Sequence, residues 1–237
     1  MKFPFLRSLF FPPRCCGCDR LLRNSGPFCY NCRELVILPS DKKSACDVCG
    51  TELSRCLCIR HQYFKKLSAV FLHEGSAKRT VLKMKFSTRP DIAASIAKGM
   101  KIQLDRRDIL SQTDIITFIP MCFYDKLKRG YNQSELIAKK LSELSGIECM
   151  PLLEKTYRTK KQHRLKKIQR SGNVIGTFEP VKENIPAIEG KRILIADDVL
   201  TTGSTMNEAA KTLLIFGAEE IFVSSFTVAK KQLNEKK

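Results

Sequence analysis

One short segment restricts the fold more than any other feature of the chain: Ile193 to Thr205, with the sequence ILIADDVLTTGST. Its apolar start predicts a buried strand that ends at two adjacent acids, and ligands of open α/β sheets bind outside such strand ends. The small polar residues that follow lead into a helix, whose N-terminus favours an anion. We therefore predict a phosphate beside the glycine of this turn and a ribose diol, or a metal-bound sugar, beside the acids. The predicted site comprises Asp197, Asp198, Thr201, Thr202, Gly203, Ser204 and Thr205.

A second polar loop follows another apolar segment, DIITFIP at residues 114–120. It contains Arg129-Gly130-Tyr131-Asn132-Gln133, just before an expected helix. A pyrophosphate needs cationic and neutral donors at a second strand end, and Arg129, Gly130, Asn132 and Gln133 can supply them. Each loop also has a purely structural interpretation. The first can be a capped strand-to-helix turn with solvated acids, and the second a helix start with a basic surface patch.

Apolar periodicity around these loops predicts alternating strands and helices. Strands are expected at 114–120, 191–196 and 221–229, and helices at 91–104, 134–145 and 204–216. Asp91 is expected to cap the first of these helices. Strands that alternate with helices of this length imply a parallel sheet covered by helices. We therefore predict an α/β domain over residues 67–237.

Nine of the eleven cysteines lie within residues 15–58, a region with little else from which to build a core. Two residues between thiolates let one turn present both sulfurs to a tetrahedral ion, and four thiolates suit structural zinc. A closed site of this kind leaves no open position, so we predict a role in folding and no metal catalysis. The expected ligands form two sets: Cys15, Cys18, Cys29 and Cys32, and then Cys46, Cys49, Cys56 and Cys58.

The alternatives for these cysteines are disulfides or free thiols. A disulfide framework needs an oxidising compartment, and nothing in the sequence suggests export. Cys16 can take the place of Cys15, and spacing alone leaves open a cross-braced pairing between the two sets. Cys122 and Cys149 fall in the apolar part of the chain, where buried small residues are expected. We predict a cysteine-rich head with two zinc-finger-like sites over residues 1–66.

The chain carries a formal net charge of +18, and its densest basic run is 155–170, with eight Lys or Arg and no acid. Such a balance favours polyanionic partners, either nucleic acid or a pyrophosphate-bearing ligand. The run has no clear period, which predicts a flexible loop over 155–173. It can close over a bound ligand and exclude water, or it can contact single-stranded DNA with an affinity that falls steeply with salt. An unordered, solvated loop is the third interpretation.

Taken together, these segments resemble the type I phosphoribosyltransferases and, more narrowly, the ComF family of competence-related proteins. The resemblance rests on the DDVLTTGST loop, on residues 129–133, on the cysteine head and on their order, and it extends from Cys15 to Ala229. It implies that the acids bind the ribose hydroxyls of phosphoribosyl pyrophosphate, with Mg²⁺, and that the TTGST turn holds the 5′-phosphate. It also assigns functional positions in the basic loop, where the expected contacts are Lys160, Gln162 and Arg170.

The sequence departs from the family pattern at three places. Ala196 stands where valine is usual, and Met121-Cys122 follows the proline of the first strand. Both changes conserve volume. The last cysteine pair, Cys56-Leu57-Cys58, is one residue tighter than the usual spacing, which weakens the second metal site.

The resemblance implies a protein that binds phosphoribosyl pyrophosphate and assists the handling or uptake of single-stranded DNA in natural transformation. The competence helicase or other transformation proteins are the implied partners. The alternative is an active phosphoribosyltransferase acting on an unidentified base or amine acceptor, so whether the protein is an enzyme stays open. No apolar run reaches the ~18 residues of a spanning helix, and the N-terminus does not read as a signal peptide. We expect a cytoplasmic protein without membrane insertion.

Overall fold

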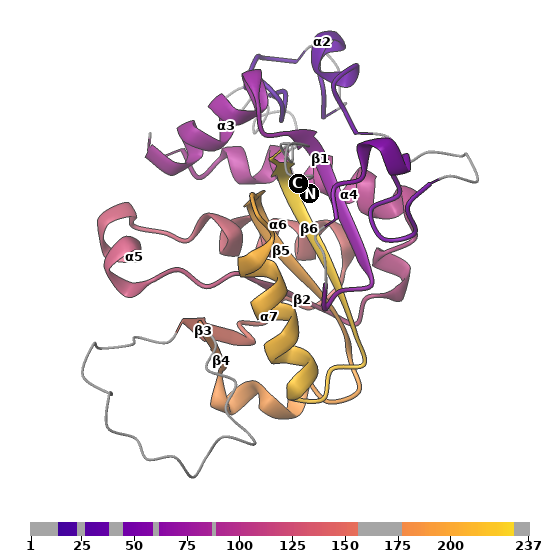
Figure 1. Cartoon of the computed structure of the whole chain (residues 1–237). Helices are drawn as coiled ribbons and strands as arrows, with labels where there is room; N and C mark the ends of the chain where they lie inside the picture. The colour runs from indigo at the N-terminus through magenta and orange to yellow at the C-terminus, as the bar shows by residue number, and fades with distance from the viewer. Residues whose placement is uncertain are drawn as a thin grey trace, which may run out of the picture.

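A four-stranded, all-parallel sheet forms the centre of the molecule (Figure 1), with the strand order β1-β6-β5-β2. The computed structural model describes residues 14–22, 27–37, 45–58, 62–86, 89–155 and 177–229. A separate antiparallel pair, β3 and β4, lies beside the sheet. The strands are β1 (Lys66–Leu72), β2 (Ile115–Phe118), β3 (Leu153–Lys155), β4 (Phe178–Pro180), β5 (Arg192–Leu200) and β6 (Glu220–Val228).

Helices cover both faces of this sheet, as the sequence predicted. α4 (Ile92–Arg106) and α6 (Gln133–Ser145) pack on one face and against each other, and α7 (Ser204–Ile215) packs on the other. α3 (Gly75–Phe86) follows β1, and α5 (Phe123–Arg129) follows β2. Four short elements complete the described part: α2 (Tyr30–Arg33) and the 3₁₀ helices η1 (Leu53–Arg55), η2 (Leu110–Gln112) and η3 (Lys182–Ala187).

The position of β5 in the sheet explains why the four residues directly before the acids, Ile193 to Ala196, are all apolar. Ile193 and Ile195 belong to the core on the α7 side, whereas Leu194 and Ala196 belong to the core on the α4 and α6 side. Side chains of a strand alternate between faces, and a central parallel strand is covered on both. Residues 193–196 of β5 therefore form one continuous apolar run.

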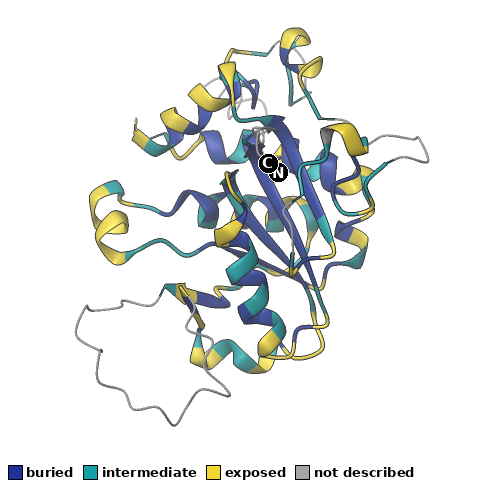
Figure 2. Cartoon of the chain, in the orientation of Figure 1, coloured by how far each residue is buried: buried dark blue, intermediate teal, exposed yellow. Residues whose placement is uncertain are grey.

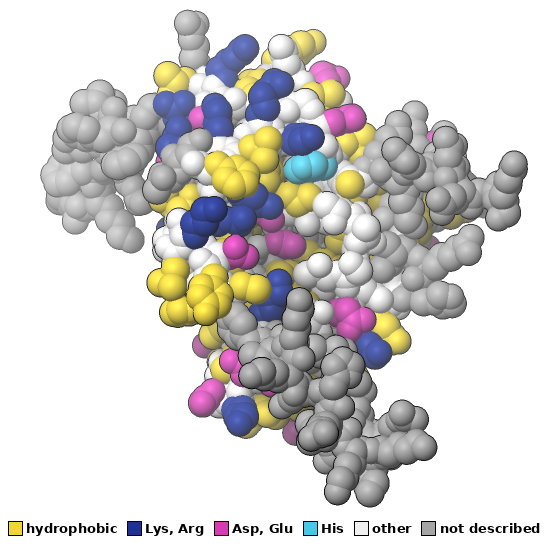
Figure 3. Space-filling view, turned by 60° about the vertical axis from the view of Figure 1, so that its left-hand side comes forward, with side chains coloured by type: hydrophobic (Ala, Val, Ile, Leu, Met, Phe, Trp, Pro, Cys, Tyr) yellow, Lys and Arg dark blue, Asp and Glu magenta, His cyan; other side chains and the backbone are white. Residues whose placement is uncertain are grey.

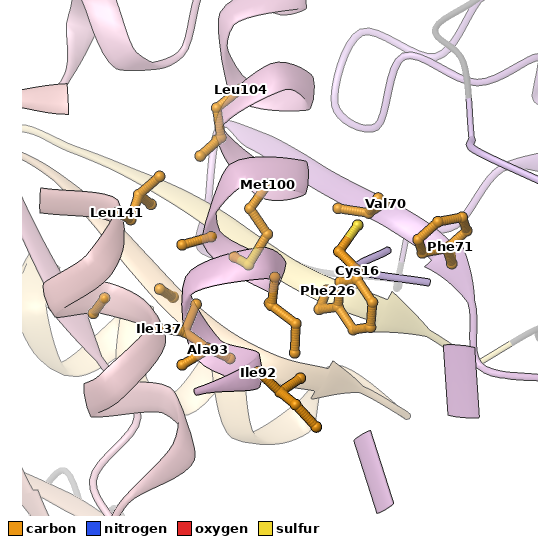
Figure 4. Close-up of a cluster of buried hydrophobic side chains, with 14 of the residues drawn as sticks. Cys16, Val70, Phe71, Ile92, Ala93, Met100, Leu104, Ile137, Leu141 and Phe226 are labelled. Atoms are coloured by element: carbon orange, nitrogen blue, oxygen red, sulfur yellow. The ribbon is translucent and has the colours of Figure 1, made fainter. Parts of the chain in front are cut away.

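The cysteine-rich head packs around the edge strand β1 and contributes to both cores. Cys16 lies among Val70, Phe71 and Phe226 (Figure 4), in the cluster that also holds α4 and α6. Cys49 belongs to the opposite cluster, on the α7 side. Two backbone hydrogen bonds join head and strand: Ile37 N–H donates to the Val70 carbonyl at 2.9 Å, and Leu67 N–H donates to Val48 at 2.7 Å. The head thus covers an edge that would otherwise be free to pair.

A buried carboxylate in the first knuckle adds a second connection between the head and the α/β part. Asp19 is surrounded by Arg14, Lys83 and Arg89, whose nitrogens lie 3.9, 3.4 and 3.5 Å from its oxygens. Buried charge is costly unless it is paired, so these contacts fix the knuckle against the end of α3.

The structure differs from the sequence-based expectations at several elements. Asp91 does stand at the start of α4, but its carboxylate accepts hydrogen bonds from Arg89 at 2.7 and 2.6 Å and makes no capping bond. Helix α5 lies where a polar loop was expected, and β1, β3 and β4 were not predicted. Cys122 and Cys149 are half-buried, where buried residues were expected. In the described residues, no helix has the length and apolar character needed to cross a bilayer.

Candidate functional site

Strand β5 carries the two predicted acids past the point where its neighbour β2 has ended. β2 pairs with β5 only as far as Phe118 opposite Ala196, whereas β6 stays paired with β5 as far as Leu200. Asp197 and Asp198 therefore lie inside an extended strand, where the sequence placed them just after it. On the β2 side the edge of β5 is open at this level. These acids lie at the carboxyl ends of the strands, outside which α/β proteins bind ligands.

Asp197 is held by two donors at this open edge. Its Oδ1 accepts a hydrogen bond from Ser134 Oγ at 2.5 Å and another from the backbone N–H of Asp198 at 2.8 Å. Burial, and then the neighbouring charge of Asp198, raise the pKa of Asp197 to about 8. Ser134 was not among the predicted site residues, although it directly follows Asn132-Gln133 in the sequence.

Asp198 is buried and faces a cation from a distant part of the chain. Lys85 of α3 places its Nζ 2.8 Å from Asp198 Oδ2. The Asp198 carbonyl accepts a hydrogen bond from Thr227 Oγ1 at 3.3 Å, and His73 Nδ1 lies 2.8 Å from the same hydroxyl. Burial lowers the pKa of His73, and Lys78 and Lys85 lower it further. No sequence pattern pointed to Lys85, which is one of several lysines in α3.

The predicted phosphate turn leaves most backbone donors of the first turn of α7 without a side-chain cap, although Ser204 N–H donates to Thr202 Oγ1 at 3.4 Å. Gly203 is the N-cap of α7 in the left-handed region, with φ of 79°, and it has no side chain to occupy the N–H groups of the first turn. Thr202 Oγ1 lies 2.8 Å from Ser204 Oγ, which orders the two hydroxyls. The four hydroxyl side chains around Gly203 are exposed: Thr201, Thr202, Ser204 and Thr205. An anion at this helix N-terminus has both types of donor within reach.

The structure places the residues of the second loop in different settings. Asn132 is buried: its Oδ1 accepts from Ser134 N–H at 3.1 Å, and its Nδ2 donates to the Ile119 carbonyl at 3.0 Å. It thereby fastens the start of α6 to the end of β2. Gln133 is also buried, and its Nε2 has no hydrogen-bond partner among the described residues. Gly130 ends α5 with φ of 79°, and a Cβ there would meet no atom within 4 Å.

A small pocket joins this loop to the last turn of α3. It has a volume of about 240 Å³ and lies between Lys85 and Phe86 on one side and Arg129 and Tyr131 on the other. The Arg129 guanidinium sits 5.6 Å from the centroid of the Phe86 ring, and the Tyr131 hydroxyl donates to the Met84 carbonyl. Lys85 therefore contacts Asp198 of β5 and also lines the pocket. Lys160, Gln162 and Arg170 lie outside the described residues.

Both cysteine sets form compact clusters that could hold zinc. Within each set the four sulfurs lie within 4.8 Å of one another. Tetrahedral Zn–S bonds of about 2.3 Å put sulfurs about 3.8 Å apart, and the structure has 3.7 Å for Cys18–Cys29, 3.6 Å for Cys46–Cys58 and 3.8 Å for Cys49–Cys56. The tighter Cys56-Leu57-Cys58 spacing does not prevent the second cluster. Each set is closed within itself, so no cross-braced pairing is needed.

Comparison with known proteins agrees with this architecture. Residues 119–237 match the phosphoribosyl transferase domain family. DNA utilization protein YhgH of Salmonella typhi is 30% identical over 213 residues, which cover 88% of this chain and 87% of that protein. Competence protein F of Haemophilus influenzae is 26% identical over 215 residues (88% and 87%), and competence protein ComFC of Bacillus subtilis is 28% identical over 226 residues (88% and 86%).

The parallel sheet, its open strand edge and this match define the class: a phosphoribosyltransferase-type α/β domain behind a cysteine-rich head. Within that class, the chain belongs to the ComF family.

Proposed function

We propose that the protein binds phosphoribosyl pyrophosphate at the open edge of β5 and uses this site while handling single-stranded DNA in natural transformation. One observation carries the proposal. Asp197 and Asp198 lie at most seven residues before the start of α7, and this helix start has no side-chain cap at Gly203. Carboxylates suit the ribose hydroxyls, and free N–H groups suit the 5′-phosphate. Cationic side chains near the pocket suit a pyrophosphate.

Two metals belong to this proposal. Mg²⁺ would be held by ligand oxygens and by the carboxylates of Asp197 and Asp198, and hard oxygen donors of this kind suit it. When bound, it neutralises the charge of the pyrophosphate. Zinc would be held by the two cysteine clusters, where it stabilises the fold. Lys85 would then give up Asp198 to the ligand-bound metal and turn its charge toward the pyrophosphate.

The DNA part of the proposal is supported by the names of the relatives and by the charge of the chain. Proteins called "DNA utilization protein" and "competence protein" match along 88% of the chain. A net charge of +18 favours a polyanion. We also propose, with this function, a cytoplasmic location and contact with other transformation proteins such as a helicase.

Calorimetry of the purified protein with phosphoribosyl pyrophosphate and Mg²⁺ tests the site. We expect saturable heat in the wild type and none in Asp197→Asn/Asp198→Asn. Asp105→Asn is the matched control, because Asp105 lies on the surface of α4 in an ion pair with Lys101. No heat of binding in the wild type, or the same heat of binding in the double variant, would refute the assignment of the site. A salt series with single-stranded DNA tests the second part, since affinity that ignores salt removes the electrostatic argument.

A second candidate function is transfer of the phosphoribosyl group to a base or an amine. It is favoured by the pocket beside Lys85, because Phe86 and Tyr131 line it with aromatic surface next to the acids. Release of pyrophosphate in the presence of a panel of bases and amines tests it. Pyrophosphate release with one acceptor establishes the reaction. If no acceptor in a broad panel gives release, ligand binding without transfer is the function.

A further inference from the structure

Helix α5 is amphipathic, yet it buries none of its seven residues. Leu127 follows Phe123 by four positions and Tyr124 by three, so it neighbours both aromatic residues on one side of the helix. All three are more than half exposed, and Figure 2 shows α5 projecting from the molecule in the colours of exposed and half-buried residues. An exposed apolar cluster on a helix this short marks an interaction site better than a folding element.

The same surface is positively charged. Residues 123–129 hold three cations and one acid, and Lys126 and Lys128 are exposed. At the far end of the helix, Arg129 stacks over Phe86, whose ring is 70% exposed at the end of α3. Figure 3 shows hydrophobic side chains beside Lys and Arg side chains on this face. We call it the α5 surface, made of Phe86, Phe123, Tyr124, Lys126, Leu127 and Lys128.

We propose that the α5 surface binds single-stranded DNA, with Phe123 and Tyr124 stacking on unpaired bases and Lys128 contacting phosphate. This inference rests on the proposed DNA-handling function and gives it a location outside both the cysteine head and the basic loop. Flat aromatic side chains next to cations are how proteins hold single strands without reading sequence. A duplex offers them no open base faces. A second copy of the chain is disfavoured, because two such surfaces would bring like charges together.

The α5 surface also adjoins the proposed ligand site. Phe86 follows Lys85, whose Nζ pairs with Asp198 at 2.8 Å, and both residues line the pocket that Arg129 closes. A strand bound along α5 therefore passes beside the acids without covering them. We expect Phe123→Ala/Tyr124→Ala to lose DNA and to keep phosphoribosyl pyrophosphate, because neither aromatic residue lines the pocket, whereas Lys128 does. This double variant separates the two parts of the proposal.

Fluorescence anisotropy with a labelled oligothymidine, measured over a series of salt concentrations, tests the inference. Phe123→Ala/Tyr124→Ala is expected to bind at least about tenfold more weakly, because each stacked base contributes to affinity. Its dependence on salt should match that of the wild type. Lys128→Gln should instead reduce the slope of log affinity against log salt by about 0.7, the value for one phosphate contact on a single strand.

The control variant is Ile215→Ala, which removes an apolar side chain of similar exposure. Ile215 is the last residue of α7, and it therefore lies at the end of that helix away from the site at Ser204. Its affinity for the oligonucleotide should equal that of the wild type. Calorimetry with phosphoribosyl pyrophosphate and Mg²⁺ on Phe123→Ala/Tyr124→Ala and on Ile215→Ala checks that the fold and the ligand site are intact.

A spectroscopic reporter can be placed in the surface itself, since the chain has no tryptophan. In Tyr124→Trp, base stacking should quench the indole emission over the same DNA concentrations at which anisotropy rises. Phe216→Trp puts the reporter just beyond the end of α7, where emission should not change. Quenching in the first protein alone supports stacking on α5.

Several results would overturn the inference. If Phe123→Ala/Tyr124→Ala binds DNA as tightly as the wild type, the DNA-binding surface lies outside α5. The proposed function would then still hold. Tighter binding of duplex than of oligothymidine removes the stacking argument. A wild-type dimer in light scattering that becomes a monomer in the double variant makes the surface a self-interface. A wild type that binds phosphoribosyl pyrophosphate but no oligothymidine overturns both this inference and the DNA-handling function.

Discussion

Two adjacent aspartates in the site have opposite surroundings, although they follow one another in sequence. Asp198 has a cation, Lys85 Nζ, at 2.8 Å. Asp197 has hydrogen-bond donors, and its pKa is raised to about 8 by burial and by the charge of Asp198. Near neutral pH the ligand-free pair therefore keeps a proton on Asp197. A bound metal ion changes this balance, because it favours the ionised form.

The raised pKa of Asp197 makes the ligand-free protein less stable as pH rises. The folded chain holds this proton up to about pH 8, whereas an unfolded aspartate loses it near pH ~4. Between these two pH values the unfolded aspartate is ionised while the folded one keeps its proton, so the free energy of unfolding falls as pH rises. Asp197→Asn keeps the oxygen that accepts from Ser134 and removes the cost. At pH 8 we expect its melting temperature to exceed that of the wild type by at least about 2 °C.

Differential scanning calorimetry without ligand measures this difference. The difference should shrink as the pH is lowered and should vanish below about pH 4, where the wild-type carboxyl is protonated in both states. The same variant should lose its heat of binding with phosphoribosyl pyrophosphate and Mg²⁺. Equal melting temperatures at pH 8 would mean that ionisation of the Asp197 carboxyl does not lower the stability of the folded protein.

Removing Lys85 should leave the buried carboxylate of Asp198 without its cation. We expect Lys85→Met to lower the free energy of unfolding by about 1–3 kcal/mol at pH 8, because an unpaired buried charge is costly. Urea denaturation measures the loss. Mg²⁺ should restore part of it by replacing the missing charge. Lys101→Met, which breaks an exposed pair with Asp105, is the control and should cost less than about 0.5 kcal/mol. A loss no larger than that of the control contradicts the proposed role of Lys85.

At the scale of elements, the strand, turn and helix around the acids could be predicted because local sequence determines them. Apolar residues, two acids and a glycine turn specify a strand that feeds a helix. Lys85 and Ser134 could not be found in this way, since contacts across the fold bring them to Asp198 and Asp197. Helix α5 escaped prediction because an exposed helix buries no stripe and leaves no periodic core signal.

Two glycines with almost the same backbone conformation separate stability from binding. Gly203 begins α7 with φ of 79°, and Gly146 ends α6 with φ of 77°. An alanine at either position should cost about 1–2 kcal/mol, because a Cβ disfavours the left-handed region. Gly203→Ala alone should also lose affinity for phosphoribosyl pyrophosphate, since its methyl group approaches the predicted phosphate. Thermal melts and calorimetry on both variants distinguish the effects. Wild-type affinity in Gly203→Ala would exclude the phosphate from this turn.

At the scale of the whole molecule, the head and the α/β part share their cores. Cys15, Cys16 and Cys32 pack in the same cluster as the sheet, and Cys49 packs in the other. The sequence suggested a division near residue 66, and that division stays a prediction. A shared core implies that the two parts unfold together, which no count of cysteines in the sequence could reveal.

Metal removal should therefore destabilise the whole chain. We expect two zinc ions per protein, and one in each of Cys18→Ser and Cys58→Ser, as measured by elemental analysis. Each variant, and the wild type with a chelator, should melt in a single transition at a lower temperature, because structural zinc contributes folding free energy. Less than one zinc per chain in the wild type refutes the first site. A separate early transition of the head contradicts the shared core.

The cover on the two outer strands of the sheet has a consequence for the protein in the cell. β2 is covered by the segment between α6 and β3, through hydrogen bonds between Ile116 and residues 148 and 150 at 2.9 and 3.0 Å. β1 is covered by the cysteine-rich head, so under the proposed zinc binding its cover depends on a supply of metal. When metal is scarce, the uncovered strand becomes a template for intermolecular β-pairing. Because the head and the sheet share their cores, zinc starvation is then expected to reduce ligand binding and to promote aggregation together.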